Sequence, residues 1–185
     1  MKKVLLAIVL FLPLLYLSLE LFIFQDVTDP IKYIYTITGV TATVILFITI
    51  TLSLITKWIN LIKYRRMIGL FGFLYAFLHF LNFYILDAEL DFAFVIKETL
   101  DKPFIYLGMI AFFILIFMAI TSTKRLFKKY KNYHKLIYFA LGLITIHFIM
   151  AQKSLTILQI IYVLLILVIG YCKLLQQIIN KNKIL

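Results

Sequence analysis

The chain has 185 residues, 64% of them hydrophobic, whereas an average soluble domain is roughly 45–50% apolar. It carries a formal net charge of +11 and a single cysteine, Cys172. These properties exclude an ordinary soluble domain, an internal disulfide and a cysteine metal cluster, and they indicate an integral membrane protein.

Six apolar runs, taken in chain order, predict six transmembrane helices. Each is near the ~20 residues that cross ~30 Å of hydrocarbon. Lys2 and Lys3 precede the first run as in a signal peptide, but no small-residue cleavage site follows, so we expect a retained membrane helix. Pro103 opens the fourth run, where proline suits a first helical turn. The expected spans are Val4–Phe24, Tyr33–Thr56, Met67–Leu86, Pro103–Thr121, Leu136–Met150 and Leu155–Leu175.

No linker, internal repeat or low-complexity segment separates these spans. The predicted fold class is therefore all-α, a polytopic membrane protein built as a six-transmembrane-helix bundle. We expect residues 1–185 to form a single integral membrane domain.

The links between the spans differ in charge. If the N-terminus is inside, fifteen of the 19 Lys and Arg residues lie on the inner side, whereas all eight acids lie toward the outer side. Cytoplasmic links carry an excess of Lys and Arg, so both termini are predicted to be cytoplasmic. Contact with an anionic leaflet accounts for the net charge, and we expect the lipid bilayer, and no nucleic acid, as partner.

Histidines and arginines fall at two predicted depths. An ionisable side chain well inside a span, as expected for His79, indicates a functional site. His79 lies fourteen residues beyond Arg65, and His147 lies thirteen beyond His134, so each separation is roughly 20 Å along a helix. His79 and His147 therefore share a level near the outer face. His134 shares the inner level of Arg65 and Arg66.

Two imidazoles that face each other from neighbouring helices are the axial ligands of a b-type haem. We therefore predict His79 and His147 as haem-iron ligands, with His134 as a further candidate. On a straight helix His134 and His147 point about 140° apart, so the inner site fits this scheme less well. Histidines that only bond between helices, or that carry protons in a transporter or assembly factor, remain alternatives. A metal site without porphyrin is disfavoured because no carboxylate is expected near the histidines.

Several stretches together are similar to one family, the MsrQ (YedZ) family of haem-binding membrane subunits. It belongs to the ferric-reductase-like transmembrane superfamily and serves bacterial periplasmic methionine sulfoxide reductase systems. The similarity covers roughly Asp29 to Met150 and implies a haem-binding core at about 33–151. The stretches are RRMIGLFGFLYAFLHF (65–80), DKPFIYLGM (101–109), TSTKR (121–125), YKNYHKLIY (130–138), ITIHF (144–148), and DPIKYI (29–34) with Thr38 and Gly39.

The resemblance implies one or two haems b in the bacterial inner (cytoplasmic) membrane, with His79, His134 and His147 matching the family's three histidines. It implies a subunit that takes electrons from the quinone pool of the respiratory chain. The electrons would pass to a separate periplasmic molybdopterin-containing methionine sulfoxide reductase, which repairs oxidised proteins. The chain would then be an electron-transfer subunit of an oxidoreductase rather than its catalytic subunit. The resemblance also implies possible FMN binding, for which no residue pattern is found.

One position departs from the wider superfamily, in which another histidine stands where this chain has Arg65. An inner haem would then have His134 and a weak, absent or unusual second ligand. Arg65 and Arg66 would instead bind haem propionates through their forked donors, or anchor the inner surface. A stand-alone haem reductase of metal ions or quinone remains an alternative, although the short links leave little room for a substrate site.

The outer link from Asp87 to Lys102 mixes acidic and apolar side chains. This pattern predicts a short helix lying in the membrane interface. We expect the link to dock the periplasmic partner, with Asp87, Glu89 and Asp91 contributing charge. An interfacial loop without a partner is the alternative.

Overall fold

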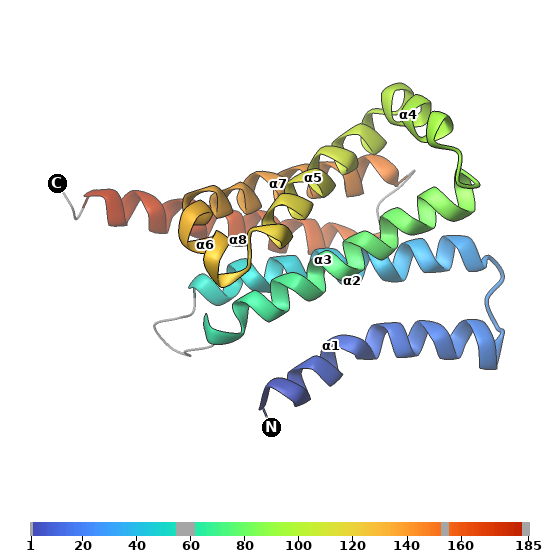
Figure 1. The fold of residues 1–185 in the computed structure, drawn as a ribbon, viewed down its shortest axis with the longest axis horizontal. Helices are drawn as coiled ribbons and strands as arrows, with labels where there is room; N and C mark the ends of the chain where they lie inside the picture. The colour runs from blue at the N-terminus through green and yellow to red at the C-terminus, as the bar shows by residue number, and fades with distance from the viewer. Residues whose placement is uncertain (1, 55–61, 153–155, 183–185) are drawn as a thin grey trace.

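The computed structural model describes residues 2–54, 62–152 and 156–182 (Figure 1), and within them the chain forms helices and no strand. The predicted all-α class is confirmed. The α-helices are α1 (Lys2–Leu19), α2 (Pro30–Leu54), α3 (Arg65–Asn82), α4 (Phe92–Asp101), α5 (Pro103–Ile120), α6 (Lys124–Tyr130), α7 (Leu136–Ala151) and α8 (Ile157–Asn182).

Five helical stretches are long and apolar enough to cross a membrane, and they overlap the first five predicted spans, although the fifth begins at Lys124 rather than at the predicted Leu136. The polytopic membrane class is therefore confirmed. The sixth predicted span falls on α8, where the apolar stretch found among the described residues is shorter, Gln159–Cys172. The predicted ends Thr56 and Leu155 lie outside the described residues. The five stretches are Lys3–Phe24, Pro30–Leu52, Arg65–Asp87, Pro103–Ile120 and Lys124–Ala151.

Helices α2 and α3 pack closely against each other at the centre of the bundle. A Cβ built on Gly72 of α3 would lie 2.8 Å from the Leu46 side chain of α2, so only glycine permits this approach. Helix α1 packs on the same pair through Leu10, and the fully buried Tyr75 of α3 donates its hydroxyl to the Leu10 carbonyl at 2.7 Å. This hydrogen bond joins residues 65 positions apart.

A second buried cluster joins α2 to the pair formed by α5 and α7. Leu46 and Phe47 of α2 meet Leu115 of α5 and Leu141 of α7 in this cluster. Helix α2 thus contributes to both apolar clusters and fixes the α1–α3 group against α5 and α7 (Figure 1). This arrangement is what brings α3 and α7, the helices that carry His79 and His147, to one site.

Charge separates the two ends of the bundle. We call the segments 20–29 and 87–101 the acidic end, because they hold all eight acids of the chain. The basic end consists of segments 62–66 and 124–135. Figure 1 places α6 far from the α1–α2 and α3–α4 connections, with the start of α1 and the end of α8 toward the side of α6. Which end faces the cytoplasm stays a prediction.

The helix of the third span extends past Asn82 as a π-helical turn, Phe83–Asp87. Such turns are rare and often accompany functional sites. Its last residue, Asp87, accepts a hydrogen bond of 2.6 Å from the Tyr35 hydroxyl of α2. The contact holds the acidic end of α3 against α2, less than three turns beyond His79.

The predicted short helix in the outer link is present as α4. The Asp91 carboxylate caps it by accepting hydrogen bonds from the backbone N–H groups of Ala93 and Phe94, as Asp does at a helix N-cap. Val95 is buried, whereas Phe92 and Leu100 are about two-thirds exposed. An apolar face with this exposure suits a helix at a membrane surface.

Candidate functional site

His79 of α3 and His147 of α7 lie next to each other. Their ring centres are 6.3 Å apart, and the ring planes are perpendicular. The two residues are 68 positions apart in the sequence, and the packing of α2, the partner of α3, against α5 and α7 brings them together. The predicted common level of these two histidines is confirmed.

The Phe104 carbonyl of α5 holds the His147 ring. Nδ1 of His147 lies 2.6 Å from this oxygen. A carbonyl oxygen can only accept, so Nδ1 carries the proton and Nε2 keeps its lone pair. The ring of Phe104 also contacts His147, with ring centres 6.0 Å apart. The imidazole is therefore fixed in one tautomer and one orientation.

The Thr38 hydroxyl holds the His79 ring in the same way. Nδ1 of His79 lies 3.3 Å from Oγ1 of Thr38, which is buried in α2. Thr38 donates its own proton to the Ile34 carbonyl at 2.6 Å, so its oxygen is left to accept from Nδ1. His79 is thereby assigned the same tautomer as His147, with its lone pair on Nε2.

Each ring lies directly against a glycine of the neighbouring helix. A Cβ on Gly39 of α2 would lie 2.9 Å from Cε1 of His79, and a Cβ on Gly108 of α5 would lie 2.9 Å from Nδ1 of His147. Real Cβ contacts are essentially never this short. At both sites the absence of a side chain on the glycine leaves room for the imidazole ring. Gly142 of α7 differs, because a Cβ there would meet nothing within 4 Å.

Tyr35 covers a further side of His79. Its ring meets the His79 ring edge-on at 5.3 Å, while its hydroxyl donates to Asp87. Tyr35 therefore links the ligand candidate to the acidic end of the bundle through one side chain.

The residues present fit the axial positions of a haem. Two imidazoles that bind one metal ion through metal–nitrogen bonds of ~2 Å have ring centres roughly 6 Å apart, as His79 and His147 do. Ligating histidines usually donate their other ring N–H to a carbonyl or another acceptor, which Phe104 and Thr38 provide. Among the described residues, no group of three or more His, Cys, Asp and Glu side chains is placed to hold a metal ion without porphyrin.

His134 lies elsewhere and is held differently. It belongs to a 3₁₀ segment, Lys131–Lys135, between α6 and α7, so the angle of about 140° calculated for a straight helix does not apply to His134 and His147. Its Nε2 lies 3.0 Å from Oγ1 of Thr121, which itself donates to the Phe117 carbonyl. Nε2 thus carries the proton, and Nδ1 is the nitrogen left with a lone pair. This is the reverse of the arrangement at His79 and His147.

The two arginines at the basic end have different surroundings. Arg65 is partly buried and close enough to His134 to act on it electrostatically, as the shared inner level predicted. Arg66 is exposed and lines a cavity together with Lys3 and Lys63. Among the residues described, the ring contacts of His134 include Phe127 at 4.8 Å but no second imidazole.

The supporting residues were not identified by sequence reasoning. Thr38, Gly39, Phe104 and Gly108 lie within the stretches that resemble the MsrQ family, but no role was assigned to them. A glycine inside an otherwise apolar helix was the available signal, because it commonly marks a close approach. Nothing in the local pattern indicated that His79 and His147 are the groups that approach.

Comparison with known proteins agrees with the family resemblance seen in the sequence. The family model described as "Ferric reductase like transmembrane component" matches residues 55–145. A "Protein-methionine-sulfoxide reductase heme-binding subunit MsrQ" of Brucella ovis is 34% identical over 132 residues, covering 68% of this chain and 60% of the relative. The protein of the same name from Brucella melitensis is 33% identical over the same shares. The chain thus spans 60% of the length of these relatives. No solved structure matches it.

Proposed function

Since the chain belongs to the ferric-reductase-like transmembrane family, we propose that it is a haem b electron-transfer subunit of a bacterial inner membrane. His79 and His147 are the proposed axial ligands. The observation that carries the proposal is the facing pair of imidazoles, each held at Nδ1 so that Nε2 is left to bind iron.

Bound haem would supply a one-electron redox couple within the hydrocarbon region. The chain's own residues orient the site. Phe104 and Thr38 hold both histidines in one tautomer and one orientation, and hydrogen bonds of this kind raise the basicity of a ligating imidazole. Tyr35 and the ring of Phe104 pack against the imidazoles and exclude water from them.

The proposed electron route runs from the quinone pool to a periplasmic molybdopterin-containing methionine sulfoxide reductase. The printed names of the Brucella relatives support the second step in its general form, because they describe haem-binding subunits of a protein-methionine-sulfoxide reductase. The chain would then be the electron-transfer subunit, and the partner would carry the catalytic site. We also propose that His134, near Arg65, serves any second haem.

The test is the absorption spectrum of the detergent-purified protein, oxidised and reduced with dithionite, together with a haemochromogen assay. We expect low-spin b-type bands that are lost in His79→Ala and in His147→Ala. His134→Ala is measured beside them and should leave the bands of the His79–His147 site in place, because its ring lies outside that pair, while any second haem at His134 would be lost. Added imidazole should restore the bands in the two alanine variants.

A colourless protein that cannot be reconstituted with haem would overturn the proposal and favour histidines that carry protons. Equal loss of the bands in all three variants would instead show that His79 and His147 are not a distinct pair. Transfer to the reductase is tested separately, by following oxidation of the reduced subunit when the purified partner is added.

A further inference from the structure

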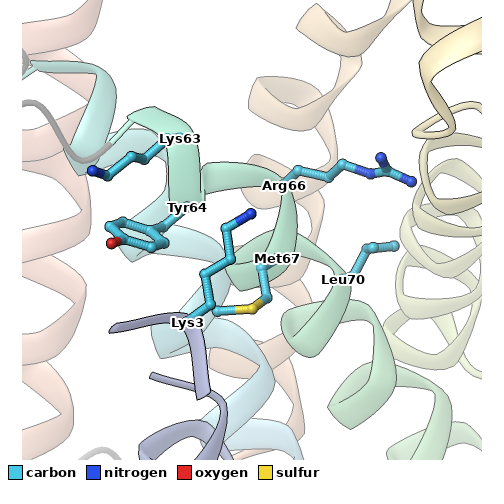
Figure 2. A pocket seen from close by; sticks show the side chains of 6 residues that line it. All are labelled: Lys3, Lys63, Tyr64, Arg66, Met67 and Leu70. Carbon is cyan, nitrogen blue, oxygen red and sulfur yellow. The ribbon is translucent and has the colours of Figure 1, made fainter. Parts of the chain in front are cut away.

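A cavity of about 210 Å³ opens at the basic end, where two separate segments meet. They are the start of α1, and the 3₁₀ turn Ile62–Tyr64 together with the first turns of α3 that follow it. In the view of Figure 2, the Lys3 ammonium lies between the head groups of Lys63 and Arg66, which extend to opposite sides. The lining residues are Lys3, Lys63, Tyr64, Arg66, Met67 and Leu70.

Within the described residues, the three cations of this cavity have no anionic partner. In the part of the chain that the structure describes, the ion pair found is Lys102 with Glu98, at the acidic end. All eight acids of the chain lie in or beside that end, and all are described. Three like charges around one cavity repel each other, and an anion bound from outside would offset this repulsion.

The remaining lining is apolar and follows α3 toward the membrane interior. Tyr64 is buried, and the Lys63 ammonium lies 5.3 Å from the centre of its ring. Met67 and Leu70, one turn apart on α3, form the apolar wall. A ligand matched to this lining has an anionic head for the cations and an apolar body next to it.

We propose that this cavity binds the phosphate of an anionic phospholipid from the leaflet at the basic end. Basic pockets between transmembrane helices on the cytoplasmic side are suited to such head groups. The Lys3 ammonium contacts the phosphate with a charge-assisted hydrogen bond, and Lys63 and Arg66 on either side attract it by their charge (Figure 2). Met67 and Leu70 contact the glycerol and upper acyl chain. Because Lys3 is on α1 and Arg66 is on α3, the lipid also holds the start of α1 against the bundle. The proposal does not depend on haem binding.

The test compares two triple variants that each remove three positive charges from the basic end. Lys3→Gln/Lys63→Gln/Arg66→Gln alters the cavity. Lys128→Gln/Lys129→Gln/Lys131→Gln is the matched control, made at exposed positions of α6 and the turn after it. Each protein is placed in phosphatidylcholine nanodiscs with and without cardiolipin or phosphatidylglycerol. Bound lipid is counted by native mass spectrometry after detergent extraction, and thermal unfolding is measured alongside.

We expect the unaltered protein and the control to retain anionic lipid and to unfold at a higher temperature in its presence. The cavity variant should bind it at least about tenfold more weakly than the control does, since its three cations line the cavity whereas those of the control lie outside it. Equal loss in both variants would overturn the proposal, because it would reflect only the general charge of the surface. No loss in either would overturn it as well.

Two further measurements keep the result interpretable. Inorganic phosphate and soluble FMN are added as competitors, and full displacement of the lipid by either would overturn the lipid assignment in favour of a soluble phosphate compound. The single variants Lys3→Gln and Arg66→Gln are measured in the same way, so that misfolding of the triple variant does not decide the outcome. Weaker lipid binding in both single variants supports the proposal, and unchanged binding in both refutes it.

Discussion

His79 and His147 differ from His134 in which ring nitrogen the protein holds. The first two have Nδ1 bonded to Thr38 and Phe104, whereas His134 has Nε2 bonded to Thr121. A ring bonded at Nδ1 presents Nε2, the nitrogen farther from the backbone, to a ligand. The pair therefore leaves Nε2 of both rings available for the proposed haem iron, whereas His134 would have to bind through Nδ1 or release Thr121.

At the residue scale, the two glycines that lie against the histidine rings can be tested directly. We expect Gly39→Ala and Gly108→Ala to displace the imidazoles and lower haem content or shift the reduction potential, since crowding a packed site costs about 1–3 kcal/mol. Gly142→Ala is the control, because its Cβ meets open space. Haem per chain and redox titration provide the measurements. Unchanged spectra and potentials in Gly39→Ala and Gly108→Ala would refute the role of the two glycines.

At the element scale, the pairs α2–α3 and α5–α7 are built alike. In each pair one helix carries the histidine, and the other supplies both the glycine against the ring and the oxygen that binds Nδ1. The oxygen comes from Thr38 next to Gly39 in α2, and from Phe104 one turn before Gly108 in α5. Helix packing, rather than any loop, therefore sets the orientation of both rings.

The attachment of α1 rests on few polar contacts, and Tyr75 makes one of them. We expect Tyr75→Phe to lower stability by about 1 kcal/mol, because it leaves the Leu10 carbonyl without this buried donor. Tyr106→Phe, at a side chain about half exposed, should change little. Thermal unfolding in detergent measures both variants. Equal effects would mean that the Tyr75 hydroxyl does not stabilise the docking of α1.

The structure changes how docking at the outer link should be tested. Asp87 accepts from Tyr35, and Asp91 caps α4, so reversing either charge would disturb the fold itself. Glu89 and Asp101 are exposed and better suited. We expect Glu89→Lys/Asp101→Lys to slow electron transfer to the partner, most strongly at low salt, with haem content unchanged. Stopped-flow oxidation by the partner measures the rate. Lys128→Glu is the control, and an unaltered rate in the double variant would argue against docking here.

At the scale of the whole molecule, charge predicts the orientation in the membrane. We expect a cysteine at position 89 to react with a membrane-impermeant maleimide in intact spheroplasts, in a Cys172→Ser background. A cysteine at position 128 should react only after permeabilisation, since Lys-rich links stay in the cytoplasm. The reverse pattern would place the acidic end inside. It would also move the proposed phospholipid to the outer leaflet.

The sequence alone determined the helical class, the first five spans, and the common level of His79 and His147. These features follow from apolar run length, helical rise and charge asymmetry, all of which are local or additive along the chain. Tertiary structure decided which atoms meet. The bonds of Thr38 and Phe104 to the imidazoles, the closeness of Gly39 and Gly108, and the cavity between Lys3 and Arg66 join residues of different helices. No periodicity within one helix specifies such contacts, because they depend on how neighbouring helices are rotated and spaced.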